Sequence, residues 1–311
     1  MATALAGGGC APAGAPAAAP PIAAASSFEW ATYAGSAGTR RYRLFVPTGY
    51  DAARPAPLVV MLHGCTQDPD DFARGTRFNA LADSARVIVA YPEQTAQLHP
   101  QKCWTWYEPA HQHAGAGEPA IIAGITREVM ARYTVDPARV YVGGVSAGGI
   151  MAVNTAASHP DLYAAVGVHS GTAYGAATSL PGALAAMRSG PADPEALVES
   201  ARGVLRAAGR DWLPIIVFHG AADEVVNPEN GRQLAAQWAR AGGAKDFVRS
   251  ETEVGGLTVV RDVFGPAAEL WMVEGLGHAW SGGSPQGTYT DARGPDASRE
   301  MLRFFLSHPR R

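Results

Sequence analysis

Short apolar runs alternate with amphipathic stretches along most of the chain. The runs at residues 58–62 and 87–91 are continuously apolar, as in strands that a parallel sheet buries on both faces. Further runs predict strands at residues 28–33, 41–46, 139–142, 164–169, 213–219, 258–264 and 270–273. Apolar residues at helical spacing predict helices at residues 78–85, 118–133, 147–157, 232–241 and 297–306.

This order of strands and helices predicts an α/β fold with a doubly wound, mostly parallel sheet and helices on both faces. Residues 28–33 and 41–46, joined by Gly35-Ser36-Ala37-Gly38, are expected to form a hairpin at the sheet edge. The Ala-rich stretch 173–210 is broken by Pro181 and by Gly190-Pro191. Two interpretations of it stay open: a cap over a functional site, or a plain crossover helix outside the sheet.

The composition fits one folded domain and argues against some classes of function. With 311 residues, 47% of them hydrophobic, the chain can bury a full core. A net charge of −3 without a basic block gives no reason to expect a nucleic-acid partner. No apolar run approaches the roughly 18 residues that a membrane-spanning helix needs.

Residues 1–26 are mostly Ala, Gly and Pro and carry no charge. Such a stretch cannot bury enough apolar surface to fold alone, so we expect a disordered leader at 1–26 and one α/β domain at 27–311. The leader has neither the basic start nor the continuous apolar core of a secretory signal. The sequence therefore leaves the compartment open.

The segment Gly144–Gly148 has the pattern Gly-x-Ser-x-Gly between a predicted strand and a predicted helix. A serine on so tight a turn is held at strained backbone angles with its hydroxyl pointing out of the sheet, and only glycine fits at the crowded flanking positions. This setting predicts Ser146 as a nucleophile. A glycine-rich turn with an incidental serine gives the same five letters and stays the alternative.

A serine nucleophile needs a base, and the base needs a third group that orients it. In an open α/β sheet these groups lie beyond the carboxyl ends of the strands. Asp223 follows the predicted strand 213–219, and His278 follows the predicted strand 270–273. The order Ser146, Asp223, His278 is that of α/β-hydrolases, so we expect these residues to form the catalytic triad. Glu224 could act in place of Asp223, and Asp223 could instead only cap a helix.

Donors for the developing oxyanion should come from two backbone N–H groups. Ala147 begins the helix after the serine, so its N–H has no partner within the helix. The loop after the strand 58–62 supplies the second donor, for which we choose the N–H of Cys65, because Gly64 lets the backbone turn in close. His63 is interpreted as a structural residue under the site.

Six motifs between residues 57 and 290 together resemble the esterase family of poly(3-hydroxybutyrate) depolymerases, which also holds feruloyl and acetylxylan esterases. They are Leu62-His63-Gly64-Cys65-Thr66-Gln67, Tyr91-Pro92-Glu93-Gln94, Cys103-Trp104-Thr105-Trp106-Tyr107, Gly144-Val145-Ser146-Ala147-Gly148, His169-Ser170-Gly171 and Gly277-His278-Ala279-Trp280-Ser281-Gly282-Gly283.

The resemblance implies an α/β-hydrolase fold, a triad of Ser146, Asp223 and His278, no cofactor, and hydrolysis of hydroxyalkanoate esters. It favours a secreted or periplasmic location, with the cytoplasm as the alternative. Family members that attack solid polymer often carry a linker and a binding domain after the catalytic domain, whereas this chain stops at its last helix. We therefore expect it to act on soluble oligomers faster than on solid polymer.

Aromatic and cysteine residues complete the expected site. Trp104, Trp106 and Trp280 are candidates to line an acyl pocket, since flat apolar rings suit a short methyl-bearing ester unit, and core packing is the alternative. Cys65 and Cys103 lie in two of the family motifs, on loops expected at the same end of the sheet. We expect a disulfide between them, and two buried thiols are the alternative.

Three rival interpretations stay open. His111-Gln112-His113 has a spacing that can bind metal, but no Cys or acidic cluster accompanies it, so we expect a solvated loop and no metal. The same ester chemistry could act on feruloyl or acetyl groups of plant polysaccharide. A binding protein without turnover, or a peptidase, is the rival from another class.

Overall fold

The computed structural model describes residues 25–310, and the leader expected at 1–26 lies outside this range except for its last two residues. Within this range, ten strands form one sheet in the order β1-β2-β4-β3-β5-β6-β7-β10-β9-β8. The strands are β1 (Ser27–Gly35), β2 (Gly38–Val46), β3 (Ala56–Leu62), β4 (Ile88–Pro92), β5 (Val135–Val145), β6 (Ala165–His169), β7 (Ile215–Gly220), β8 (Val248–Val254), β9 (Leu257–Phe264) and β10 (Ala268–Val273).

The central strands β4, β3, β5, β6, β7 and β10 are parallel to one another, and antiparallel pairs lie at both ends of the sheet. Every residue of β3, β4, β6 and β7 is buried, as their continuous apolar runs predict. The hairpin of β1 and β2 closes between Gly35 and Gly38 and forms one edge, as expected. The predicted α/β-hydrolase architecture is therefore confirmed.

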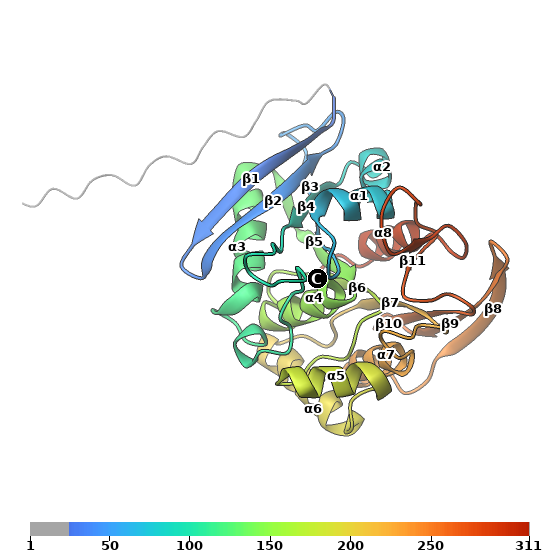
Figure 1. Cartoon of the computed structure of the whole chain (residues 1–311). Helices are drawn as coiled ribbons and strands as arrows, with labels where there is room; N and C mark the ends of the chain where they lie inside the picture. Colours follow the sequence, from blue (N-terminus) through green and yellow to red (C-terminus); the bar gives the residue numbers. More distant parts are fainter. Residues whose placement is uncertain (1–24, 311) are drawn as a thin grey trace, which may run out of the picture.

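Helices cover both faces of the sheet (Figure 1). One core contains side chains of α3 (Gly117–Arg132), α4 (Ala147–Ser158), α6 (Pro194–Ala208) and α7 (Glu229–Ala241). The other contains side chains of α1 (Pro69–Thr76), α2 (Phe78–Ala85) and α8 (Ala297–Ser307). Because apolar side chains leave the strands alternately toward both cores, the sheet is buried between two helical layers.

Two elements have no counterpart in the apolar pattern. β8 is exposed along its whole length and pairs only with β9, so no buried face marks it in the sequence. α1 is marked in the sequence by N-terminal capping residues and not by apolar residues at helical spacing. Asp68 accepts a hydrogen bond from the N–H of Asp71, and Pro69 occupies the first turn. The stretch 173–210 divides into α5 (Leu180–Ser189) and α6, broken near Gly190 as expected.

Two further short strands, β11 (Trp280–Ser281) and β12 (Thr290–Asp291), pair beside the main sheet. No helix within residues 25–310 combines the length and apolar character needed to cross a membrane.

Candidate active site

Ser146 lies between β5 and α4 with φ 54° and ψ −127°, a conformation that costs a non-glycine residue of order 1–3 kcal/mol. The surroundings impose this turn. A Cβ on Gly144 would collide with the carbonyl oxygen of Leu62, and a Cβ on Gly148 would collide with the carbonyl oxygens of Leu62 and His63. The two glycines therefore let α4 and β3 approach closely enough to present Ser146 at the carboxyl edge of the sheet.

His278 and Asp223 meet across the ends of β10 and β7. His278 Nδ1 lies 2.8 Å from Asp223 Oδ2. The second carboxylate oxygen accepts 2.9 Å hydrogen bonds from the N–H groups of Val225 and Val226. Asp223 therefore orients an imidazole and also shapes the turn that follows β7. It caps no helix, since α7 begins only at Glu229.

The environment of Asp223 keeps its carboxyl ionised. Burial alone raises the pKa, but the hydrogen bond and charge of His278, with the N–H of Val226, outweigh burial and lower the pKa below its usual 3.8. An ionised carboxylate is the species that holds an imidazole in one tautomer and stabilises its protonated form. The neighbouring Glu224 is exposed, so it does not compete for His278.

The loop after β3 contains a backbone N–H that has no acceptor in the described part of the chain. The N–H of Gly64 donates to Gln67 Oε1 at 3.0 Å, and the N–H of Thr66 donates to the carbonyl oxygen of Gln101. Among residues 25–310, the N–H of Cys65, which lies between them, meets no acceptor. Together with the N–H of Ala147, at the start of α4, it is available to an oxyanion.

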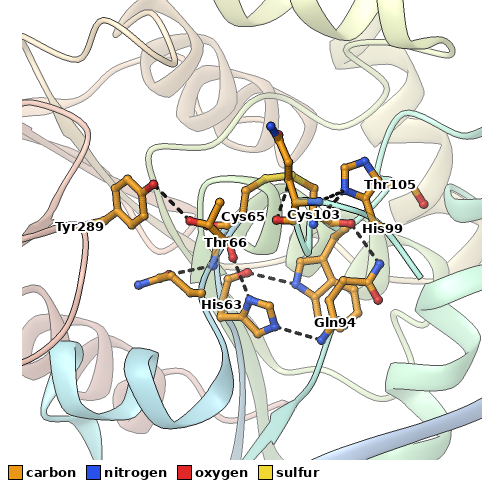
Figure 2. Close-up of a disulfide and its surroundings, with 12 residues drawn as sticks. His63, Cys65, Thr66, Gln94, His99, Cys103, Thr105 and Tyr289 are labelled. Atoms are coloured by element: carbon orange, nitrogen blue, oxygen red, sulfur yellow. Dashed lines mark hydrogen bonds between the residues drawn. A yellow bond between two sulfur atoms is a disulfide. The ribbon is translucent and has the colours of Figure 1, made fainter. Parts of the chain in front are cut away.

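The two cysteines of the loops after β3 and β4 are joined (Figure 2). A disulfide links Cys65 to Cys103, which lie 38 residues apart in sequence. It fastens the loop that carries the Cys65 N–H to the segment that carries Trp104.

A cavity of about 450 Å³ opens beside Ser146 and reaches His278, Cys65 and Ala147. Its walls are largely apolar, and among the described residues no Asp, Glu, Lys or Arg lines it. The apolar lining residues are Trp104, Trp106, Tyr107, Val145, Ile150, Leu180, Ala183, Leu184, Met187, Val225 and Val226.

Trp104 and Trp106 line this cavity, but the expectation that Trp280 does so is wrong. Trp280 is 1% exposed and belongs to the core formed with α1, α2 and α8. Its ring stacks on His169, meets Phe72 edge-on, and donates a 3.1 Å hydrogen bond to Ser298 Oγ. Its place two residues after His278 sets it on β11, whose side chains turn away from the cavity into the core.

One wall comes from α5, which the sequence left undecided between a cap and an outer helix. Leu180, Leu184 and Met187 of this helix line the cavity, with Val225 from the loop after β7. α5 is therefore a cap over one side, whereas α6 packs against α7. A periodic apolar pattern indicates a buried stripe, so it gave no sign that Leu180 and Leu184 are about half exposed at a rim.

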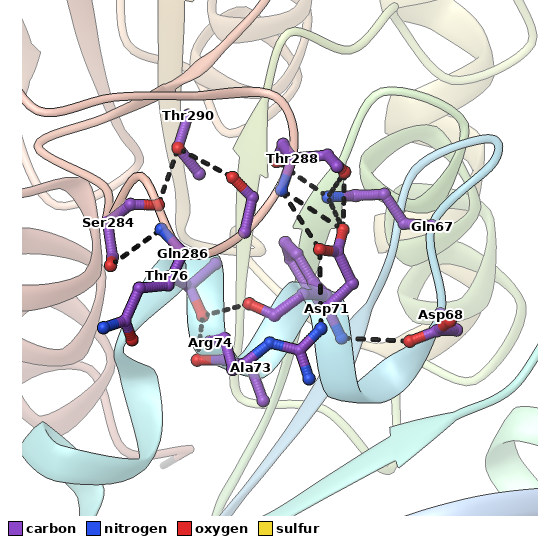
Figure 3. Close-up of polar contacts among 12 residues, drawn as sticks. Gln67, Asp68, Asp71, Ala73, Arg74, Thr76, Ser284, Gln286, Thr288 and Thr290 are labelled. Atoms are coloured by element: carbon purple, nitrogen blue, oxygen red, sulfur yellow. Dashed lines mark hydrogen bonds and ion pairs between the residues drawn. The ribbon is translucent and has the colours of Figure 1, made fainter.

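The segment after β11 contacts the loop that follows β3 and the start of α1 (Figure 3). Gln67 Nε2 donates to the carbonyl oxygen of Thr288 and to Asp71 Oδ2, both at 3.1 Å, and the N–H of Thr288 donates to Asp71. At the cavity rim, Thr66 Oγ1 donates to Tyr289 Oη at 3.1 Å. Sequence reasoning missed Asp71, Thr288 and Tyr289, because the contacts of Thr288 and Tyr289 join positions more than 200 residues apart.

The His111-Gln112-His113 segment is not simply a solvated loop, which corrects the expectation. Gln112 is buried, and its side-chain amide donates to the carbonyl oxygens of Trp106 and Ala177. His111 Nδ1 lies 2.8 Å from Thr105 Oγ1 and 3.4 Å from Glu118. The segment therefore holds Trp106 in the cavity wall. Within the described part of the chain, no three potential metal-binding side chains gather.

Comparisons with known proteins find a family of esterases. The profile of the family described as "Esterase PHB depolymerase" matches residues 40–255. Poly(3-hydroxyalkanoate) depolymerase C of Paucimonas lemoignei is 33% identical over 75% of this chain and 56% of its own length, so the chain matches little more than half of that relative. Feruloyl esterase B of Neurospora crassa is 29% identical over 90% of this chain and 92% of its own length. An acetyl xylan esterase from Aspergillus awamori superposes with a TM-score of 0.74 at 21% identity, covering 90% of this chain and 99% of that one.

Proposed function

The chain belongs to the PHB depolymerase family of esterases, and on that premise we propose that it is a serine esterase acting through Ser146, His278 and Asp223. The family description contains the word esterase, and two of the relatives are named as feruloyl and acetylxylan esterases. The geometry that supports the assignment is the 2.8 Å contact between His278 and Asp223, with Ser146 and His278 on one cavity wall.

The reaction proceeds in two acyl-transfer steps. Asp223 binds Nδ1 of His278, which leaves Nε2 to take the proton of Ser146 as the serine oxygen attacks the ester carbonyl. The carbonyl oxygen becomes an oxyanion, which accepts hydrogen bonds from the N–H groups of Cys65 and Ala147. The imidazolium protonates the leaving alcohol, and water then repeats the sequence on the acyl-enzyme to release the acid.

The apolar cavity supports our choice of substrate class, which is a short-chain hydroxyalkanoate ester. Such an ester presents methyl groups and carbonyl oxygens but few hydrogen-bond donors, which suits an apolar wall that lacks charged side chains. The rim exposes aliphatic side chains, with Leu180 52%, Leu184 46% and Val225 51% exposed. Sugar hydroxyls of a polysaccharide ester would find no polar partner on these three side chains. Besides Ser146 and His278, the polar side chains in the cavity lining belong to Gln67, His99, Gln101, Tyr107 and Tyr289.

An ester panel tests this proposal. We expect kcat/KM for a soluble 3-hydroxybutyrate trimer to exceed that for methyl ferulate and for acetylated xylan by at least about tenfold, a difference of roughly 1.4 kcal/mol. Faster hydrolysis of methyl ferulate or acetylated xylan would contradict the proposed substrate class but not the esterase activity. Turnover by a folded Ser146→Ala variant would instead overturn the mechanism, because removing a triad nucleophile typically costs several orders of magnitude.

Solid polymer is expected to be a poor substrate. The exposed rim offers a few aliphatic side chains, and a small apolar patch adsorbs weakly to a surface. Rates on polymer film should therefore fall well below rates on the trimer, and fusion of a polymer-binding module should raise them. Equal film erosion with and without the module would show that adsorption does not limit the rate.

A secreted or periplasmic location belongs to the same proposal. The disulfide between Cys65 and Cys103 supports it, since such bonds persist in oxidising compartments. Fractionation of the native host with an antibody against the chain tests the location, and recovery in the cytoplasm alone would contradict it.

A further inference from the structure

His63 lies directly behind the oxyanion loop and is completely buried. Gly64 and Cys65 line the cavity, but His63 does not. Its Nδ1 lies 2.8 Å from the carbonyl oxygen of Gly64, and its Nε2 lies 3.0 Å from the backbone nitrogen of Gln94 (Figure 2). The imidazole therefore bridges the loop after β3 to the end of β4.

These two contacts fix the tautomer of His63. A backbone N–H can only donate, so Nε2 must accept from Gln94 with its lone pair. Burial lowers the pKa of His63 to about 4, so at neutral pH the ring carries one proton. That proton is on Nδ1, which donates to the carbonyl oxygen of Gly64.

The bond from Nδ1 sets the rotation of one peptide group. The Gly64 carbonyl and the Cys65 N–H belong to the same planar trans peptide unit, and they point in opposite directions. While the carbonyl oxygen is held on His63, the N–H of Cys65 must point away from the buried ring, toward the cavity that Cys65 lines.

The disulfide cannot supply this constraint. It fixes the side chain of Cys65 to Cys103, but a peptide group can rotate between two Cα atoms that stay in place. The backbone of His63 has its own tether, since Trp104 Nε1 donates to the His63 carbonyl oxygen at 3.0 Å. Within residues 25–310 the Gly64 carbonyl oxygen accepts no hydrogen bond other than that of His63, so we infer that the ring holds the orientation of the next peptide group.

We propose that His63 is a positioning residue that aims the Cys65 N–H at the oxyanion, through its Nδ1 hydrogen bond to the Gly64 carbonyl. This inference rests on the proposed function, in which that N–H stabilises the transition state. It assigns His63 no contact with substrate and no proton transfer.

A matched pair of substitutions separates the two ring nitrogens. In His63→Asn the side-chain amide nitrogen reaches the position of Nδ1 and can still donate to Gly64. In His63→Gln the amide reaches the position of Nε2, so its oxygen can accept from Gln94 while the Gly64 carbonyl loses its donor. We expect His63→Gln to lower kcat roughly 100-fold, as the loss of an oxyanion donor does, with KM nearly unchanged. His63→Asn should stay within a few-fold of the natural protein.

The decisive readout compares an ester with its thionoester, in which sulfur replaces the carbonyl oxygen and accepts hydrogen bonds poorly. The natural protein should strongly prefer the oxygen ester. His63→Gln should lose most of that preference, because only the ester loses a donor, whereas His63→Asn should keep it. A merely structural defect would lower both rates alike and leave the ratio intact.

Equal ratios in the natural protein and a folded His63→Gln would overturn the inference, and so would equal losses in the Asn and Gln variants. If His63→Gln does not fold, His63→Leu, which has the size of Asn and no donor, replaces it in the comparison. Failure of the proposed function looks different: the natural protein itself would then show no preference for the oxygen ester, or folded Ser146→Ala would stay active.

Discussion

Strained residues gather around the cavity. Seven non-glycine residues among those described have positive φ, and two of them, Arg77 and Arg86, end helices. The other five lie in loops beyond the carboxyl ends of strands: Thr66, Lys102, Ser146, Ser170 and Tyr289. Each costs of order 1–3 kcal/mol and persists only where the surroundings impose it. The strain is thus concentrated where the proposed chemistry takes place.

The pairing of His278 with Asp223 gives the first prediction. Asp223→Asn should lower kcat by about 10⁴-fold with the fold intact, because an amide nitrogen toward Nδ1 favours the wrong tautomer. Steady-state kinetics on p-nitrophenyl butyrate measure the loss. Glu224→Gln is the matched control, exposed and one residue away, and should leave kcat unchanged. A larger loss of kcat in Glu224→Gln than in Asp223→Asn would show that Glu224 is the carboxylate that orients His278.

Trp280 gives the second prediction, which follows from its burial in the core. Trp280→Ala should lower the free energy of unfolding by about 3–5 kcal/mol, as removal of a buried aromatic ring does. The ratio of trimer to p-nitrophenyl ester hydrolysis should not change. Trp30→Ala is the control, because that side chain is 39% exposed and should cost far less. Urea unfolding measures the free energies of unfolding. A selective loss of trimer hydrolysis in Trp280→Ala would indicate that Trp280 contacts the substrate.

At the scale of the element, α5 gives the third prediction. Leu180→Ser combined with Leu184→Ser should lower kcat/KM for the trimer about tenfold, since two partly exposed leucines lose roughly 1.4 kcal/mol of apolar contact with an extended substrate. Hydrolysis of p-nitrophenyl acetate should change little. Leu98→Ser serves as control, because Leu98 is 54% exposed and does not line the cavity. If Leu98→Ser lowered kcat/KM for the trimer as much as the double variant does, α5 would not contact the substrate.

The loops after β3 and β4 give the fourth prediction. Cys103→Ser opens a loop of 38 residues and should lower the free energy of unfolding by about 4 kcal/mol in the chain-entropy picture. Reducing agent should destabilise the natural protein similarly and leave the variant unchanged. Mass analysis of non-reduced peptides from oxidised protein must yield the Cys65–Cys103 linked pair. Its absence would contradict the disulfide.

At the scale of the whole molecule, buried histidines with lowered pKa values make stability depend on pH: His63, His159, His169 and His219. Burial lowers the pKa of His63 to about 4, and burial with the charges of His219 and His278 lowers that of His169 to about 3. Between pH 6.5 and these values the unfolded chain binds protons that the folded chain does not. Stability should therefore fall as pH drops, by about 1.4 kcal/mol per pH unit for each histidine, and stay nearly level above pH 7.

Urea unfolding at pH 7, 6 and 5 measures this fifth prediction. The free energy of unfolding of His169→Gln should depend on pH less steeply, by the equivalent of about one proton. His113→Asn, at an exposed position, should leave this pH dependence unchanged. Below about pH 4 the contribution of His63 levels off, and Asp223, whose pKa is lowered, adds a further loss of stability. A stability that rises toward acid would contradict the buried neutral state of these rings.

The apolar pattern predicts the architecture, because β3, β4, β6 and β7 are buried on both faces and carry nearly continuous apolar runs. The sequence also places Ser146, Asp223 and His278 each after a strand, and the carboxyl ends of parallel strands meet at one edge of the sheet. It could not find β8, whose residues are all exposed, or α1, which is marked by capping alone.

Only the tertiary structure decided which side chains face the cavity. Trp104 and Trp280 look alike in sequence, each close to a predicted site residue. Trp104 lines the cavity, whereas Trp280, on β11, packs into the core with α1, α2 and α8. The rim on α5 and the bracing of Gln67 by Thr288 depend on contacts between distant segments. The spacing of residues along the chain predicts which side chains share a face of a helix or strand, but only tertiary packing determines which residues that face contacts.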